Sequence, residues 1–241
     1  MKLTIDGREL EAKEGQTILK VAGDNNIYIP TLCYNEAVAA YGSCRICMVE
    51  IEKGKRKRLV ASCLYPVEEG LVVYTDSPKV IANRKMLMQL LLARCSKNEA
   101  VKSLAKKLGV TETPFKLEDK NCILCGLCAR ACEEVVGTSA ISMVNRGVTR
   151  EVSAPFHEAS IECIGCGSCF YVCPIDAIKM EDKGDVRTLT MPNPEMQEVK
   201  FKLSKCKKCG SYWAPEKQLA FIAKKAGIAP ESFDLCPDCR D

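Results

Sequence analysis

The sequence has little histidine, few aromatic residues and no long apolar run. With one histidine among 241 residues, most acid–base constellations are excluded, and neither a Ser/His/Asp set nor a pair of carboxylates stands out. Because no stretch of 18 apolar residues is present, a membrane-spanning helix is not predicted. Residues 1–7 turn polar at once and lack the apolar centre of a signal peptide, so we expect a cytoplasmic protein.

The sequence also lacks a large excess of either positive or negative charge. The 35 basic and 31 acidic residues leave a net charge of +4, which is too small to indicate a partner nucleic acid. The sequence has no G-x-G-x-x-G motif after a predicted strand and no P-loop, so nucleotide binding is expected on another subunit. The chain is therefore not expected to be a catalyst on its own.

Cysteine is the residue in excess, at 17 of 241 positions. Thiols stay reduced in the cytoplasm, so this many of them indicates metal binding rather than disulfides. Sixteen of the cysteines fall into four groups of four, which leaves Cys95 over.

The two central groups share the spacing C-x2-C-x2-C-x3-C, which is typical of [4Fe–4S] loops. They are Cys122, Cys125, Cys128, Cys132 and Cys163, Cys166, Cys169, Cys173. In two-cluster ferredoxins the fourth cysteine of each run binds the other cluster. Carried over here, that pattern predicts one cluster on Cys122, Cys125, Cys128, Cys173 and one on Cys132, Cys163, Cys166, Cys169. The alternative is a pair of zinc knuckles, but zinc sites use paired C-x2-C units and not such a run.

The first group is Cys33, Cys44, Cys47 and Cys63, and its first gap is longer than in a plant-type [2Fe–2S] loop. The surrounding pattern still favours a [2Fe–2S] domain. Hairpins are predicted at residues 3–12 and 48–61, a helix at 17–24 and a strand at 71–74, which together make up a β-grasp fold. A zinc site or unligated thiols is the alternative.

The last group consists of two C-x2-C pairs, Cys206/Cys209 and Cys236/Cys239, which resemble the knuckles of a rubredoxin or a zinc ribbon. A helix is predicted between them, from Pro215 to Gly227. Zinc, a further [4Fe–4S] cluster and rubredoxin-type iron all stay open as occupants of this metal site.

Residues 27–63 resemble the [2Fe–2S] domain of the large iron–sulfur subunit of NADH dehydrogenase (respiratory complex I). They resemble equally the diaphorase iron–sulfur subunits of soluble NAD-linked hydrogenases and formate dehydrogenases, and so do residues 122–133, 146–147 and 163–174. The resemblance covers roughly residues 1–185. It implies an electron-transfer subunit between a flavin/NAD(P)(H)-binding subunit and a catalytic hydrogenase or formate dehydrogenase subunit. Ferredoxin is a further candidate partner, because electron-bifurcating versions of these complexes use similar subunits.

One departure from this resemblance concerns residues 86–95. Many of the similar subunits carry a His-plus-three-Cys [4Fe–4S] site here, but the matching segment lacks the histidine and two of the cysteines, so that cluster is not expected. Cys95 is then predicted to be a buried helix thiol, and His157 a surface residue. Residues 80–109 are predicted to be helical, either as a bridge between the two ferredoxin units or as an apolar stripe that docks another subunit.

The predicted architecture is α+β in four parts. These are a β-grasp [2Fe–2S] domain (1–79), a helical bridge (80–115), a two-[4Fe–4S] ferredoxin-like domain (116–185) and a small four-cysteine metal-binding tail (186–241). The predicted function is electron transfer within an NAD(P)-linked oxidoreductase. A stand-alone multi-cluster ferredoxin-like carrier and a zinc-scaffolded interaction protein are the alternatives, although a diffusible carrier needs no bridge and no tail.

Overall fold

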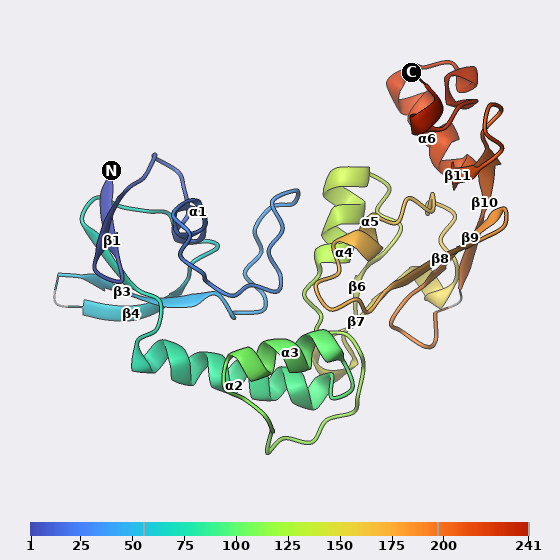
Figure 1. Cartoon of the computed structure of the whole chain (residues 1–241). Helices are drawn as coiled ribbons and strands as arrows, with labels where there is room; N and C mark the ends of the chain where they lie inside the picture. The colour runs from blue at the N-terminus through green and yellow to red at the C-terminus, as the bar shows by residue number, and fades with distance from the viewer. Residues whose placement is uncertain (55, 197, 241) are drawn as a thin grey trace. The chain divides into compact units, whose positions relative to one another are not determined.

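The computed structural model describes residues 1–54, 56–196 and 198–240, which form two compact units, Met1–Cys125 and Gly126–Asp241 (Figure 1). The first cysteine group lies in the first unit and the third and fourth lie in the second, whereas the group Cys122, Cys125, Cys128, Cys132 is divided between the two units. Within the described ranges, none of the helices has the length and apolar character that crossing a membrane requires.

The first unit is built on a five-stranded sheet with the strand order β2-β1-β5-β3-β4. Its strands are β1 (Lys2–Ile5), β2 (Arg8–Glu11), β3 (Met48–Lys53), β4 (Arg56–Ala61) and β5 (Leu71–Tyr74). β1 and β5 pair in parallel, and the other neighbours are antiparallel. Helix α1 (Ile18–Asp24) buries its apolar side chains in the same core as the strands. This sheet with its helix is the predicted β-grasp arrangement, although residue 55 in the predicted β3–β4 turn lies outside the described residues.

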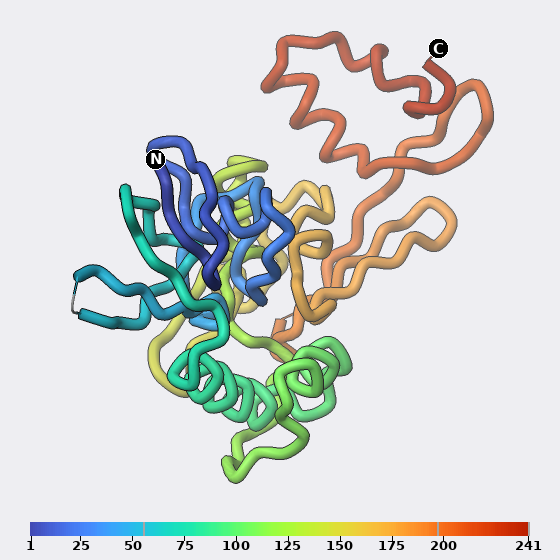
Figure 2. Tube along the Cα trace, turned by 60° about the vertical axis from the view of Figure 1, so that its left-hand side comes forward, coloured from blue at the N-terminus to red at the C-terminus, as the bar shows by residue number. Residues whose placement is uncertain are grey.

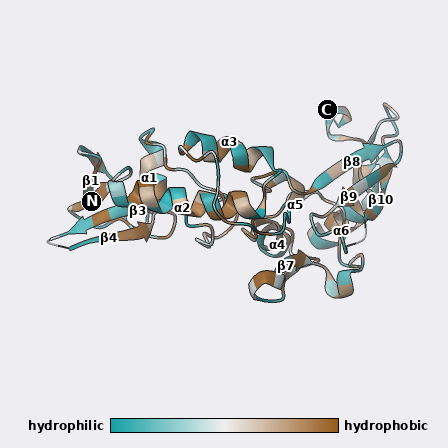
Figure 3. Ribbon diagram, turned by 90° about the horizontal axis from the view of Figure 1, so that it is seen from below, coloured by the Kyte–Doolittle hydropathy of each residue, from teal (hydrophilic) through white to brown (hydrophobic). Residues whose placement is uncertain are grey.

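Two helices follow the sheet in the first unit, α2 (Pro78–Arg94) and α3 (Glu99–Lys107). The segment predicted to be helical is thus interrupted. Cys95 caps the end of α2, and the Asn98 side chain begins α3 by accepting a hydrogen bond from the backbone N–H of Val101 (3.0 Å). α2 packs against β3 and α3, and Figure 3 shows hydrophobic and hydrophilic residues along it. The helices therefore belong to the first unit, and their proposed bridging role stays a prediction.

The second unit contains short helices, a two-stranded sheet and a four-stranded sheet. Its helices are α4 (Leu127–Arg130), the π-helix η1 (Ala131–Val136), η2 (Gly147–Thr149), η3 (Pro155–His157), α5 (Ser168–Tyr171), α6 (Glu216–Ala226), η4 (Pro230–Phe233) and η5 (Pro237–Cys239). Its strands are β6 (Ser142–Val144), β7 (Glu151–Ser153), β8 (Lys179–Lys183), β9 (Val186–Thr190), β10 (Val199–Lys205) and β11 (Tyr212–Pro215). α4 packs against α5, and α6 packs against β10 and β11.

The four-stranded sheet has the order β11-β10-β9-β8, with every pair antiparallel. It leads directly from the region of the central cysteines into the tail, as Figure 2 shows along the chain. The predicted domain boundary at 185/186 falls in the turn between β8 and β9. Helix α6 lies where a helix was predicted between the two cysteine pairs, and it ends at Gly227, whose φ is +64°.

Candidate metal centres

The first cysteine group lies in the first unit, with Cys33, Cys44 and Cys47 in the segment between α1 and β3 and Cys63 just after β4. Its sulfur atoms are arranged in twos: the Sγ atoms of Cys47 and Cys63 are 3.4 Å apart, and the Cys44 N–H donates to the Cys33 Sγ (3.4 Å). The hydrogen bond with Cys44 lowers the pKa of Cys33 to about 5, and the one with Cys63 lowers the pKa of Cys47 to about 6. Two pairs of sulfurs fit a [2Fe–2S] cluster, because each of its irons takes two cysteines.

An arginine on α2 fixes the loop that carries Cys47. The guanidinium of Arg84 donates to the backbone carbonyls of Ile46 (3.1 Å) and Met48 (2.9 Å), on either side of this cysteine. Arg84 is only 8% exposed, and burial lowers its pKa, while the nearby Cys47 opposes that shift. A buried positive charge therefore lies within electrostatic reach of the cysteine group.

The predicted set Cys122, Cys125, Cys128, Cys173 is divided between the two units, so this ligand set as a whole stays a prediction. Within the first unit, Arg94 Nε donates to the Cys122 carbonyl (2.7 Å), and Ser43 Oγ donates to the Cys125 carbonyl (3.2 Å). Within the second unit, the Ala177 N–H donates to Cys173 Sγ (3.2 Å).

Cys95 lies at the end of α2 and is completely buried, as predicted for this thiol. Burial raises its pKa to about 11, and the neighbouring Cys122 adds to the shift. The thiol therefore stays protonated at neutral pH, in contact with the start of a cysteine loop.

The other central set, Cys132, Cys163, Cys166 and Cys169, lines one cavity in the second unit. The remaining wall is mostly apolar, and the described residues that line it include no carboxylate. The apolar wall is formed by Val136, Ala140, Ile141, Ile164, Leu189, Met191, Met196 and Val199. Burial raises the pKa of Cys169 to about 12 and also raises that of Cys163, so metal ligation is what would deprotonate them here. Four cysteines around one mostly apolar pocket fit a [4Fe–4S] cluster.

Hydrogen bonds to sulfur complete this cavity. The backbone N–H of Ala140 donates to Cys132 Sγ (3.2 Å), and the hydroxyl of Thr138 lies 3.3 Å from the same sulfur. The Cys166 thiol donates to the Ser168 hydroxyl oxygen (3.4 Å), and the hydroxyl would become the donor if the sulfur were a thiolate ligand. Such contacts orient the ligands of an iron–sulfur cluster and raise its potential, because they stabilise the added negative charge.

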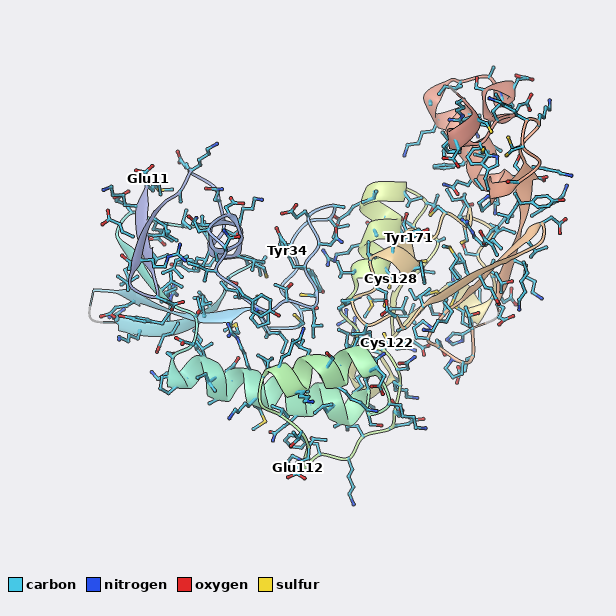
Figure 4. The ribbon with its side chains drawn as sticks, viewed as in Figure 1. Glu11, Tyr34, Glu112, Cys122, Cys128 and Tyr171 are labelled. Atoms are coloured by element: carbon cyan, nitrogen blue, oxygen red, sulfur yellow. The ribbon has the colours of Figure 1, made fainter. Side chains whose placement is uncertain are left out.

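Both central cysteine loops use left-handed backbone at equivalent places. Gly126 (φ +74°) precedes α4 and Gly167 (φ +78°) precedes α5, while Leu124 (φ +53°) and Gly165 (φ +71°) lie two residues earlier. Figure 4 labels Cys128 on α4 and Tyr171 on α5. The two loops therefore share one backbone path, which turns the chain around the cysteines before each short helix.

Gly165 also has no room for a side chain. A Cβ atom there would lie 2.6 Å from the ring of Phe201, which comes from β10. The Gly165 carbonyl accepts a hydrogen bond from Arg187 Nη1 (3.2 Å). Arg187 is 9% exposed and makes a two-pronged ion pair with Asp182, with both N–O distances at 2.8 Å. The cysteine loop is therefore held between a ring on one strand and a guanidinium on another.

Arg84, Arg94 and Arg187 were not identified from the sequence as part of any site. Each donates to a backbone carbonyl of a different cysteine loop. None lies close in sequence to the cysteine loop that it contacts, so the cysteine spacing could not predict these arginine contacts. Arg84 and Arg94 are charged residues in a predicted helix segment with many apolar residues, which is only a weak indication of a buried role.

His157, predicted to be a surface residue, has a side chain that is 36% exposed and pairs with a carboxylate. Its Nε2 lies 2.6 Å from Glu151 Oε1, and its Nδ1 lies 3.8 Å from Glu195 Oε2. The imidazole thus has local partners on β7 and in the loop after β9.

The four tail cysteines are brought together by the fold. The sulfur atoms of Cys206, Cys209, Cys236 and Cys239 all lie within 4.8 Å of one another. Cys206 and Cys236 are buried, whereas Cys209 is exposed. The two knuckles therefore make one compact tetrathiol site.

Three segments of the chain match known families. Residues 1–78 match the family described as 2Fe-2S iron-sulfur cluster binding domain. Residues 116–180 and 162–211 match two families that are both described as 4Fe-4S dicluster domain. These matches cover the first three cysteine groups and reach into the fourth.

Several curated proteins are similar to three quarters of the chain. The HndD subunit of the NADP-reducing hydrogenase of Solidesulfovibrio fructosivorans is 34% identical over 74% of this chain and 36% of its own length. A subunit of an NADH-quinone oxidoreductase of Rhizobium meliloti is 33% identical over 74% of this chain and 24% of its own length. The chain thus spans about a quarter to a third of these relatives.

A solved structure is similar as well. It is that of an NAD+-reducing [NiFe]-hydrogenase in the H2-reduced state, with a TM-score of 0.57 and 29% identity over 64% of this chain and 74% of the other. The fold, the cysteine groups and these similarities define the chain as an electron-transfer iron–sulfur protein with one [2Fe–2S] and two [4Fe–4S] clusters. More narrowly, it is similar to subunits of NAD(P)-reducing hydrogenases and NADH-quinone oxidoreductases, which confirms the resemblance to hydrogenase and NADH dehydrogenase subunits found in the sequence.

Proposed function

We propose that the chain transfers electrons between a flavin/NAD(P)(H)-binding subunit and a catalytic subunit of the hydrogenase or formate dehydrogenase type, in the cytoplasm. The cavity lined by Cys132, Cys163, Cys166 and Cys169 carries this proposal, because an apolar pocket with four cysteines suits a buried redox centre and not a substrate site. The similarity to NAD(P)-linked hydrogenase proteins supports the choice of complex.

The ligand sets follow from the cysteine spacing. The [2Fe–2S] cluster is assigned to Cys33, Cys44, Cys47 and Cys63. One [4Fe–4S] cluster is assigned to Cys122, Cys125, Cys128 and Cys173, and the other to Cys132, Cys163, Cys166 and Cys169. Their content is about ten irons per chain.

When bound, these clusters supply one-electron redox chemistry. The chain's own residues bind them, exclude water and set the charge around them. Ile164, Met191 and Met196 keep water out of the cavity in the second unit. Arg84 and Arg187 place buried cations near two cysteine groups, where each favours an added electron.

The chain is expected to depend on partner subunits for both the donor and the acceptor. The test is to purify it anaerobically, alone and from cells that express it with its neighbouring subunits, and to add NAD(P)H to each preparation. We expect the visible absorption of the clusters to bleach within seconds in the complex and to persist in the isolated chain, because the chain has no dinucleotide motif.

Iron analysis accompanies this test. About six irons or fewer per chain would contradict the three-cluster assignment. A chain that purifies free of partners, yet exchanges electrons rapidly with several unrelated donors, would instead be a stand-alone carrier. A colourless protein that contains only zinc would indicate the zinc-scaffolded interaction protein and would end both other hypotheses.

A further inference from the structure

The tail cysteines lie closer together than the ligands of an iron–sulfur cluster. All four sulfur atoms lie within 4.8 Å of one another, and Cys209 Sγ is 3.8 Å from Cys236 Sγ. Four thiolates at about 2.3 Å from one tetrahedral ion are separated by about 3.8 Å. The thiolates of a [4Fe–4S] cluster each bind a different iron, so they lie roughly 6 Å apart. The spacing in the tail therefore suits one ion.

We infer that Cys206, Cys209, Cys236 and Cys239 bind a single zinc ion, so that the tail carries no redox centre. The inference is independent of the proposed electron transfer, because it concerns a different cysteine group with its own geometry.

A match to a 4Fe-4S dicluster domain extends over residues 162–211 and so includes Cys206 and Cys209. Taken by itself, that match would assign this pair to a further cluster. The structure instead places the pair against Cys236 and Cys239, which lie beyond the matched residues. The fold therefore separates the first knuckle from the ferredoxin pattern that precedes it.

Backbone and side-chain contacts hold the two knuckles in this arrangement. The Cys236 N–H donates to Cys206 Sγ (3.3 Å), so the second knuckle already supports a sulfur of the first. Lys207 in the first knuckle donates from its backbone N–H to the Asp234 carbonyl (2.9 Å) and from its Nζ to the Asp234 carboxylate (2.6 Å). The knuckles are thus preorganised across the loop that separates them in sequence.

Charge also favours an occupied site. Four thiolates around a divalent ion carry a net charge of −2, which needs nearby cations. Lys208 supplies one within the first knuckle, whereas Lys207 is already paired with Asp234, and Asp238 adds a negative charge within the second knuckle. Arg240 directly follows the second, where its guanidinium stacks over Trp213 and Phe233, 5.3 Å from the centre of each ring.

Zinc is preferred over iron for two reasons. At a site of given ligands, Zn2+ binds more tightly than Fe2+. The site is also closed, with four protein ligands and no position for a substrate, as in structural zinc sites. A sheet edge, α6 and two short 3-10 helices form a small tail that benefits from such a cross-link.

The test measures zinc and iron in the full-length protein after anaerobic purification. We expect about one zinc per chain, and a zinc-edge X-ray absorption spectrum with four sulfurs at about 2.3 Å. The double substitution Cys209→Ser with Cys239→Ser should remove the zinc and leave the iron content unchanged. Cys95→Ser is the matched control, because it removes a thiol outside the site and should keep the zinc.

Two results would overturn the inference. Four additional irons in place of zinc, lost together in the double variant, would mean a cluster in the tail. One additional iron with the absorption of a rubredoxin would mean a mononuclear redox site. Zinc content does not depend on partners or on NAD(P)H, so failure here is separable from failure of the proposed electron transfer.

Discussion

The guanidinium of Arg187 and the backbone carbonyl of Gly165 meet at 3.2 Å, within the second unit. Gly165 lies between Cys163 and Cys166, so a buried cation is fixed to the loop that carries two candidate ligands. The carboxylate of Asp182 holds the guanidinium from its other side. Arg187 therefore acts on this site through the loop backbone and through its charge.

Arg187→Gln should lower the reduction potential of the cluster proposed in this cavity. The lost positive charge no longer stabilises the added electron, and we expect a fall on the order of 50 mV. An EPR-monitored redox titration of the full-length protein measures it.

Asp182→Asn provides a control of opposite sign. It removes the negative partner and leaves the guanidinium in place, so the potential should rise. Equal potentials in the wild type and both variants, with all clusters retained, would show that Arg187 only supports the fold.

Gly165→Ala should prevent the cluster proposed in this cavity from binding. The new Cβ would meet the Phe201 ring at 2.6 Å, and the left-handed backbone adds roughly 1–2 kcal/mol of strain. Gly184→Ala is the matched control, since its φ is also positive but no described atom lies within 4 Å of the new Cβ. Iron analysis should show loss only in the first variant, with partial recovery when Phe201→Ala is added. Equal losses in both variants would contradict this account.

Arg84→Met should destabilise the first unit by about 2–4 kcal/mol. Two buried carbonyls, those of Ile46 and Met48, would lose their guanidinium donor. Thermal unfolding followed by the visible circular dichroism of the [2Fe–2S] cluster measures this loss. Lys85→Met is the control: Lys85 is the exposed neighbour of Arg84, and its substitution should change the midpoint temperature of unfolding little. A similar small change in both variants would mean that the contacts of Arg84 are dispensable.

Cys173→Ser tests the exchange of ligands between the two central groups. We expect it to remove the cluster proposed on Cys122, Cys125 and Cys128, although these residues lie far away in sequence. EPR spectra of the reduced protein distinguish the two [4Fe–4S] signals. If the variant disturbs only the cluster of Cys163, Cys166 and Cys169, each run supplies its own fourth ligand.

Cys95→Ser should leave the iron content and the EPR spectrum of the reduced protein unchanged. The thiol is buried and has a raised pKa, and the sequence of the helix segment places no further cysteine or histidine beside it. Loss of a whole cluster signal would show that Cys95 is a ligand. The test is warranted because Cys95 lies close to Cys122.

The strands and helices of the first unit could be predicted because their signals are local. β5 is a short continuous run of apolar and aromatic residues, and Thr17 marks the start of α1 by capping it. The break after α2 was missed, although Asn98 followed by an acidic residue is a helix-start signal. The apolar residues on both sides of that break suggested one continuous helical segment.

The surroundings of the candidate sites could not be predicted in the same way. Cysteine spacing indicates the chemistry, since each loop is local in sequence. Arg187 and Phe201 reach Gly165 from two strands of the last sheet, and such contacts depend on how the sheet packs. The boundary predicted at 185/186 reflects the end of the family resemblance, whereas hydrogen bonding continues across it from β8 to β9.

Met191 and Met196 face the cysteine cavity from the segment between β9 and β10, and they are 8% and 7% exposed. Oxidation of a thioether to a sulfoxide turns an apolar wall residue into a polar one. Oxidants would therefore damage this cavity in two ways: the cluster would be lost, and the wall of the cavity would become polar. Rebuilding with iron and sulfide would repair the first part, and full repair would also require a methionine sulfoxide reductase.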